Sequence, residues 1–169
     1  MSALKHAFAP LLGPEPLCLV LGTLPGEDSL RLQQYYGHGR NQFWRIMADA
    51  LLVHLNRDDY AAKQAMLWQH RLALWDTLAA AERQGSLDSR IKRPQLNDVP
   101  GLLAAQPSIR HVLFNGQQAA RYAQRHGDSL PETVQYHTLP STSPAHTLAY
   151  AAKLAVWRSA LQAAGVAPV

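Results

Sequence analysis

Four short runs that are expected to form strands, separated by segments of helical periodicity, constrain the fold of this chain more than any other feature. The runs are residues 17–21, 72–75, 109–114 and 133–139. The first is continuously apolar, which is typical of a strand buried on both faces. Strands that alternate with helices predict a parallel sheet covered by helices on both faces. We expect four strands in the spatial order 2-1-3-4, within one domain that spans residues 1–169.

The segments between these runs predict the helices and the loops. Apolar side chains recur at helical spacing from about Asn41, and the last helix is expected from Thr147 to about Ala164. Asp58 or Asp59 can cap a second helix, and Asn97 or Asp98 a third. A helix is also expected after Asn115-Gly116. The rest is expected to be irregular: a Pro-rich arm (1–16), a long loop (22–40), a short helical turn (77–83) and a polar loop (85–94).

Composition excludes several classes of protein. No apolar run approaches the roughly 18 residues of a membrane helix, and the N-terminus lacks the pattern of a signal peptide. A single cysteine, Cys18, excludes an internal disulfide and suits a reducing compartment, so we expect a cytoplasmic protein with no membrane partner. The net charge of +4 permits nucleic-acid binding, although compositional bias of the source genome would explain it equally well.

The stretch Gly22-Thr23-Leu24-Pro25-Gly26 ends the first strand abruptly. A glycine at each end lets the backbone turn sharply and come close to a ligand. Open parallel sheets bind their ligands at the carboxyl ends of strands, where this turn lies. The stretch is not a phosphate loop, because no Gly-Lys-Ser/Thr follows, and it lacks the spacing of a dinucleotide fingerprint. It is therefore either part of a binding site or a plain turn between a strand and a helix.

A dense polar and aromatic run follows, from Tyr35 to Trp44. The flat faces of Tyr35, Tyr36 and Phe43 could sandwich a base, and the amide of Asn41 could read a base edge with one donor and one acceptor. The alternative is that Phe43 and Trp44 belong to the core and Asn41 only caps a helix. We favour the core for Trp44 and a functional role for Asn41.

The segment from Leu139 to His146 forms the second loop of interest. Its three consecutive hydroxyls, Ser141-Thr142-Ser143, could donate to phosphate oxygens if they lie at a helix N-terminus; an ordinary capped turn is the alternative. His146 could help to flip a base out of a nucleic acid or stabilise a transition state, or it could simply be a surface residue. Asp76 and Asn115 follow predicted strands and would share the same edge of the sheet. The eight histidines are scattered, so no metal site is expected.

Together these segments resemble the uracil-DNA glycosylase superfamily, and within it the hypoxanthine-DNA (deoxyinosine) glycosylase family. The resemblance covers about residues 10–160 and follows one order along the chain. It rests on residues 22–26 with 35–44, on Leu74-Trp75-Asp76-Thr77-Leu78, on residues 85–89, on Phe114-Asn115-Gly116 and on Ser141-Thr142-Ser143-Pro144-Ala145. It implies a three-layer α/β/α sandwich, in agreement with the pattern of strands and helices.

The resemblance also implies roles for individual residues. The first turn would form the floor of the base pocket, but Leu24 stands where most of the superfamily has an Asp or Asn that orients the attacking water. The hypoxanthine branch is similar in this, and the role would pass to Asn41. Tyr36 or Phe43 would stack on the flipped base. The second motif would pinch the DNA backbone, with Ser141 where the superfamily often has histidine. The expected base-binding residues are Gly22, Thr23, Leu24, Pro25, Tyr36, Phe43, Asp76 and Asn115, and the expected DNA-binding residues are Ser141, Thr142, Ser143, Pro144 and His146.

The implied activity is that of a monomeric DNA repair glycosylase. It would flip a deaminated base out of DNA, hydrolyse the N-glycosidic bond and leave an abasic site, with hypoxanthine as the first expectation and uracil or xanthine as the second. No lysine lies in the motifs, so a Schiff base is not expected, nor is a cofactor, a metal or a protein partner. Two alternatives remain: a non-catalytic module that binds damaged DNA and has lost the water-activating residue, and a hydrolase of free nucleosides or nucleotides.

Overall fold

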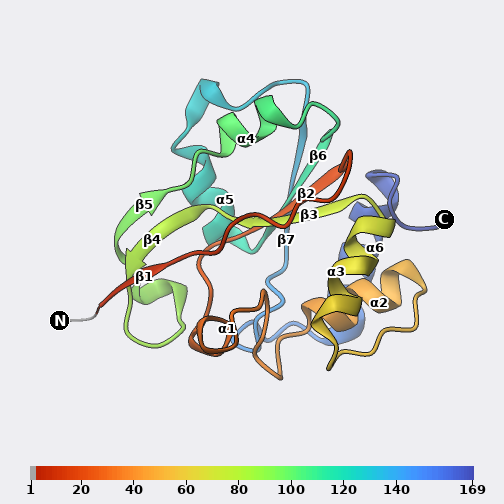
Figure 1. Cartoon of the computed structure of the whole chain (residues 1–169), viewed down its shortest axis with the longest axis horizontal. Coiled ribbons are helices and arrows are strands. Elements are labelled where there is room, and N and C mark those ends of the chain that lie inside the picture. Colours follow the sequence, from red (N-terminus) through yellow and green to blue (C-terminus); the bar gives the residue numbers. More distant parts are fainter. Residues whose placement is uncertain (1–2) are drawn as a thin grey trace.

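A parallel sheet of four strands forms the centre of the molecule. The computed structural model describes residues 3–169. The strands are β2 (Cys18–Gly22), β3 (Leu72–Asp76), β6 (His111–Asn115) and β7 (Gln135–Leu139), in the order β3-β2-β6-β7. Numbered along the chain, these four run 2-1-3-4, which confirms the expected order. Figure 1 shows the sheet between two groups of helices.

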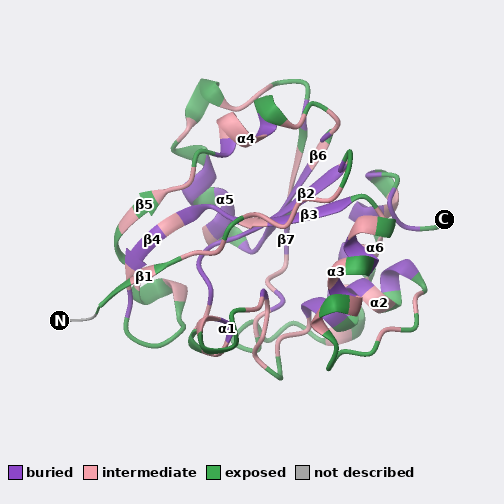
Figure 2. Cartoon of the chain, in the orientation of Figure 1, coloured by how far each residue is buried: buried purple, intermediate pink, exposed green. Residues whose placement is uncertain are grey.

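Helices cover both faces of this sheet because alternate side chains of each strand point to opposite faces. Cys18 and Val20 of β2 pack with helices α2 (Phe43–Leu51), α3 (Tyr60–Gln69) and α6 (Tyr150–Ala163). Leu19 and Leu21 pack against the other face, where α4 (Val99–Ala105) and α5 (Gln117–Gln124) lie. Figure 2 shows the buried residues concentrated on the sheet and on the helix faces turned toward it. The three-layer α/β/α expectation is confirmed.

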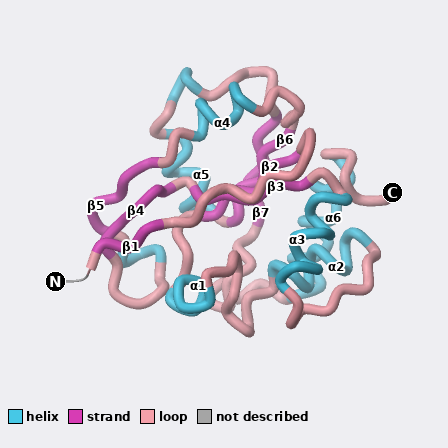
Figure 3. The backbone as a smooth tube through the Cα atoms, in the orientation of Figure 1, coloured by secondary structure: helices cyan, strands magenta, loops and turns pink. Residues whose placement is uncertain are grey.

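A second, smaller sheet was not expected from the sequence. β1 (Leu4–His6), β4 (Leu78–Glu82) and β5 (Lys92–Leu96) form an antiparallel sheet in the order β1-β4-β5. The predicted helical turn at 77–83 is therefore wrong; β1 lies within the Pro-rich arm, and β5 begins within the polar loop. The alanines of β4 favour a helix locally, but pairing with β1 on one edge and β5 on the other decides the outcome. Figure 3 shows these strands beside the main sheet.

Other boundaries differ from the sequence predictions at the ends of the helices. The loop from Gly22 to Arg40 contains a short helix, α1 (Glu27–Leu32). α6 begins at Tyr150 rather than Thr147. The predicted caps are confirmed for α3 and α4: the side chains of Asp59 and Asp98 accept hydrogen bonds from the backbone N–H groups of Ala62 and Gly101. Across the described chain, no helix is both long enough and apolar enough to cross a membrane.

Candidate active site

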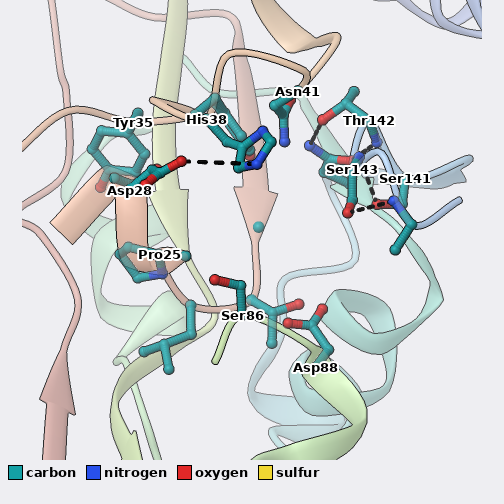
Figure 4. Close-up of a pocket in the computed structure, with 18 of the residues that line it drawn as sticks. Pro25, Asp28, Tyr35, His38, Asn41, Ser86, Asp88, Ser141, Thr142 and Ser143 are labelled. Atoms are coloured by element: carbon teal, nitrogen blue, oxygen red, sulfur yellow. Dashed lines mark hydrogen bonds and ion pairs between the residues drawn. The ribbon is translucent and has the colours of Figure 1, made fainter. Parts of the chain in front are cut away.

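A cavity of about 460 Å³ lies at the carboxyl edge of the parallel sheet. The carboxyl ends of β2, β3 and β6 meet there and bring Gly22, Asp76 and Asn115 together as the sequence predicted. The volume falls within the range of roughly 300–1,000 Å³ that holds small ligands. In Figure 4, Asn41 and Ser143 line one side of the cavity, and Ser86 and Asp88 line the opposite side.

Three loops that are distant in sequence are joined at one wall of the cavity. The Asn115 side chain donates to the Thr142 hydroxyl and accepts from the Thr142 backbone N–H, both at 2.9 Å. The backbone N–H of Gln42 donates to the Thr142 carbonyl at 3.0 Å. Thr142 is fully buried. Its hydroxyl is therefore unavailable to a phosphate, which corrects its expected role in DNA binding: Thr142 holds the loops together.

The second loop is also anchored from below by α6. The Trp157 indole N–H donates to the Pro140 carbonyl at 2.9 Å, and Lys153 Nζ donates to the His146 carbonyl at 2.8 Å and to the Ser143 carbonyl at 3.4 Å. The Lys153 side chain is 1% exposed. Lys153 and Trp157, one helical turn apart on α6, thus hold both ends of the second loop by hydrogen bonds.

The hydroxyls of this loop do not lie at a helix N-terminus, because α6 begins seven residues after Ser143, at Tyr150. The expectation that a helix dipole assists phosphate binding at these hydroxyls is therefore wrong. Ser141 Oγ accepts from the Ser143 N–H, and Ser143 Oγ accepts from the Ala145 N–H, each at 3.2 Å. Each serine keeps its own hydroxyl proton for an acceptor outside the loop. Pro144 and His146 are exposed and line the cavity with them.

Asn41 lies just before helix α2 and also lines the cavity. Its Oδ1 accepts from the backbone N–H of Phe43 at 2.9 Å, at the start of α2. This hydrogen bond orients the amide, so that Nδ2 points into the cavity (Figure 4). Asn41 therefore presents a fixed N–H donor to whatever occupies the cavity.

Of the expected aromatic residues, Tyr36 lines the cavity and Phe43 does not. The two rings stack with centroids 4.1 Å apart, and Phe43 is fully buried in the core with Trp44. The expectation that Phe43 could contact a base is corrected, because Tyr36 covers it. Stacking on Phe43 therefore fixes the orientation of the Tyr36 ring, which lines the cavity.

Asp76 and Tyr36 converge over Gly22 at the floor of the cavity. A Cβ on Gly22 would lie 2.6 Å from Asp76 Oδ1 and 3.0 Å from the Tyr36 hydroxyl, so only glycine fits there. Asp76 is 4% exposed, and within the described chain neither its Oδ2 nor the Tyr36 hydroxyl has a hydrogen-bond partner. The pKa of Asp76 is raised to about 7, first by burial and then by the negative charge of Asp88, and the Arg83 guanidinium opposes this rise.

The turn after β2 is held by a buried arginine. Arg83 Nη2 donates to the Pro25 carbonyl at 2.6 Å, and its Nε donates to the Gly85 carbonyl at 2.8 Å. Thr23, Leu24 and Pro25 line the cavity as the sequence predicted. Leu24 is 7% exposed and offers an apolar side chain there, so it cannot orient a water molecule.

Several lining residues were not assigned a role from the sequence, among them Asp28, His38, Ser86 and Asp88. The carboxyl of Asp88 has its pKa raised by burial, against the effects of the nearby Thr23 hydroxyl and Arg83. Asp88 lies in residues 85–89, which carry part of the family resemblance, so this resemblance was the sequence feature that could have identified it as a site residue. Within residues 3–169 no group of three or more His, Cys, Asp or Glu side chains could hold a metal ion.

Comparisons with known proteins show the family of this chain. Residues 10–164 match the model of the uracil DNA glycosylase superfamily. A protein named hypoxanthine DNA glycosylase from Methanosarcina acetivorans is 37% identical over 145 residues, which cover 85% of this chain and 89% of the relative. One of the same name from Methanosarcina barkeri is 35% identical over 118 residues, covering 70% and 75% of the two chains. A solution NMR structure from M. acetivorans, provisionally assigned as a uracil DNA glycosylase, superposes with a TM-score of 0.83 at 32% identity and covers 96% of this chain and 99% of its own.

Proposed function

Because the chain belongs to the uracil DNA glycosylase superfamily, we propose that it is a DNA glycosylase that removes a deaminated base and leaves an abasic site. Hypoxanthine is the favoured base, and uracil or xanthine comes second. The names of the two Methanosarcina relatives support this order. Each of these bases carries a ring N–H beside a carbonyl, so a pocket that recognises this edge would accept deaminated bases as a class.

The observation that carries the proposal is the convergence of one aromatic face and several fixed polar groups in one cavity. A flipped base would stack on Tyr36, while its edge would meet Asp76 and Asn115 at the floor. The backbone of Gly22 can approach the base because it has no side chain. Enzymes that act on a base inside DNA extrude it into such a pocket, where stacking and edge contacts identify it.

Asn41 is proposed to act on the sugar side of the base. Its Oδ1 is held by the N–H at the start of α2, which leaves Nδ2 as the group presented to the reaction. An N–H donor can hold the oxygen of a water molecule next to the sugar, but it cannot accept the proton of that water. Asn41 would therefore position the water, a contribution made through orientation and preorganisation.

Hydrolysis without a covalent intermediate fits the placement of the lysines. Among the described residues, no lysine lines the cavity. Lys153, which lies beneath the second loop, is buried and donates to backbone carbonyls. A Schiff base needs a free amine next to the sugar, so we propose a monofunctional glycosylase.

The second loop is proposed to hold the DNA backbone at the mouth of the cavity. Ser141 and Ser143 retain hydroxyl protons that can be donated to phosphate oxygens, and Pro144 and His146 are exposed beside them. The anchoring of this loop by α6 means that little conformational freedom is lost when DNA binds. The net charge of +4 assists association with DNA in the same way as for other basic proteins.

The proposal is tested with labelled oligonucleotides that carry hypoxanthine, uracil or xanthine, followed by alkali to cut abasic sites. Cleavage at hypoxanthine above the other bases is the expected result. Binding without cleavage would favour a non-catalytic module that recognises damaged DNA. Turnover of free deoxyinosine, with none in an oligonucleotide, would favour a hydrolase of free nucleosides.

A further inference from the structure

One buried carboxyl group at the floor of the cavity has no structural partner. Asp76 is 4% exposed, and its Oδ2 makes no hydrogen bond among the described residues. An unpaired carboxylate in such a place is costly, because burial removes water and supplies nothing in return. Structural acidic side chains that are buried are normally paired, so this one needs another explanation.

The groups that face Asp76 do not neutralise it. Arg83 is the nearby cation, but its guanidinium donates to the carbonyls of Pro25 and Gly85 instead. Asp88 adds a second negative charge, Tyr36 and Tyr35 contribute neutral hydroxyls, and Asn115 and Gly22 carry no charge. Burial, and then the charge of Asp88, raise the pKa of Asp76 to about 7, so the neutral acid makes up a large share of this group at neutral pH.

A neutral carboxylic acid at this place has a proton to give. In a flipped nucleotide the sugar stays with the DNA backbone at the mouth of the cavity, so the part of the base remote from the sugar reaches the floor. In hypoxanthine this part includes the 6-oxo oxygen, and ring nitrogen N7 is the next acceptor, on the neighbouring edge of the base. As the bond to the sugar breaks, negative charge builds up on the base, and an ionised carboxylate there would oppose departure.

We propose that Asp76, as the neutral acid, donates a proton to the departing purine. This inference rests on the proposed glycosylase function and adds a catalytic residue to it. The bond between C1′ and N9 breaks, and its electron pair enters the purine ring. The O–H bond of Asp76 breaks, and its proton bonds to N7 or the 6-oxo oxygen, which leaves a carboxylate. The oxygen of water bonds to C1′ and releases a proton to solvent, and the carboxylate regains a proton from solvent, so one water is consumed in all.

At the start of the second loop, Ser141 lines the cavity with a hydroxyl group. Stabilising the departing base as an anion needs a strong donor at that position, and a serine hydroxyl is a weaker one. Protonation from the floor of the cavity removes the need for a stabilised anion. General acid catalysis of this kind contributes about 10²–10⁴-fold when the pKa of the acid lies near the working pH.

The test is the single-turnover rate of hypoxanthine excision from pH 5.5 to 9, in the wild type and in Asp76→Asn. Asparagine has a similar shape and still donates a hydrogen bond, but it cannot transfer a proton. We expect the wild-type rate to be level at low pH and to fall about tenfold per pH unit above pH 7. At pH 6, Asp76→Asn should excise hypoxanthine at least about 10²-fold more slowly than the wild type. The fall in rate above pH 7 should be absent from this variant.

A matched control is Asp98→Asn, which makes the same chemical change at the cap of α4, away from the cavity, where asparagine also caps. It should leave both the rate and the profile unchanged. A rate in Asp76→Asn within a few-fold of the wild type, or a wild-type rate that rises through pH 7, would overturn the inference while leaving the glycosylase function intact. Absence of excision by the wild-type protein on every base would overturn the proposed function and the inference together.

Discussion

Replacing Asp76 by asparagine should stabilise the fold at alkaline pH. In the unfolded chain this carboxyl has a pKa near 3.8, whereas burial raises the pKa to about 7 in the folded protein. The folded state therefore holds a proton that the unfolded state releases between these two values. The free energy of unfolding falls as the pH rises through this window, because the released proton favours the unfolded chain.

The magnitude follows from the difference of about three pH units, since each unit corresponds to about 1.36 kcal/mol. The wild type should lose up to about 4 kcal/mol of stability between pH 4 and pH 8 through this one group. Asparagine has no charge to bury, so Asp76→Asn should escape this loss. We expect the two proteins to be equally stable at pH 4, and the variant to be about 2–4 kcal/mol more stable at pH 8.

The assay is urea unfolding followed by tryptophan fluorescence at pH 4, 6 and 8, with Asp98→Asn as the control for a general effect of removing a negative charge. Other titrating groups are shared by the two proteins and cancel in the difference. An advantage of Asp76→Asn that stays constant with pH, or is largest at pH 4, would refute the reasoning. If Asp76→Asn is more stable than the wild type but inactive, then the buried carboxyl of Asp76 lowers the stability of the fold while it is required for activity.

Three further predictions follow from the loops around the cavity. Asn41→Ala should abolish turnover. Asn41→Asp should keep the hydrogen bond to the Phe43 N–H at the start of α2 yet remain inactive, because the Nδ2 donor is lost. Thermal unfolding measures the effect on the fold and single-turnover rates measure the effect on catalysis; an active Asn41→Asp would show that the Nδ2 donor is not required. Ser143→Ala should weaken binding to hypoxanthine-containing DNA more than it slows excision, as fluorescence anisotropy and single-turnover rates would show; equal losses in both would contradict a role in binding. Lys153→Met should destabilise the fold by about 1–3 kcal/mol, because the His146 and Ser143 carbonyls lose their donor, and it should weaken DNA binding about tenfold; unchanged affinity would mean that the loop does not depend on this anchor.

Local sequence was a good guide wherever one segment decides its own structure. β2 is a short, continuously apolar run, which is typical of a strand buried on both faces, and all five of its residues are buried. The caps Asp59 and Asp98 were also predictable, because a cap involves only the next turn of helix. The same holds for the placement of Gly22, Asp76 and Asn115 at one edge, since it follows from parallel pairing alone.

Predictions failed where the outcome depends on contacts between distant segments. β4 is alanine-rich and reads as a helical turn, but β1 and β5 pair with its two edges and hold it extended. Thr142 reads as one of three equivalent hydroxyls, yet Asn115 captures it and leaves only the serines free. Phe43 and Tyr36 belong to the same aromatic run of the sequence, and only the packed structure shows that Phe43 is buried beneath the Tyr36 ring.

By itself, the sequence determined the order of strands and helices, the parallel sheet and the edge at which a site forms, because these depend on periodicity and on the direction of the chain. Tertiary structure alone decided the chemical state of the site. Asp76 is an ordinary acidic residue in the sequence. Its pKa rises to about 7 only in the folded chain, where it is buried close to Asp88 and where Nε and Nη2 of Arg83 donate to backbone carbonyls. Burial and the arrangement of neighbouring charges are properties of the folded chain, and they set which groups can give or accept a proton.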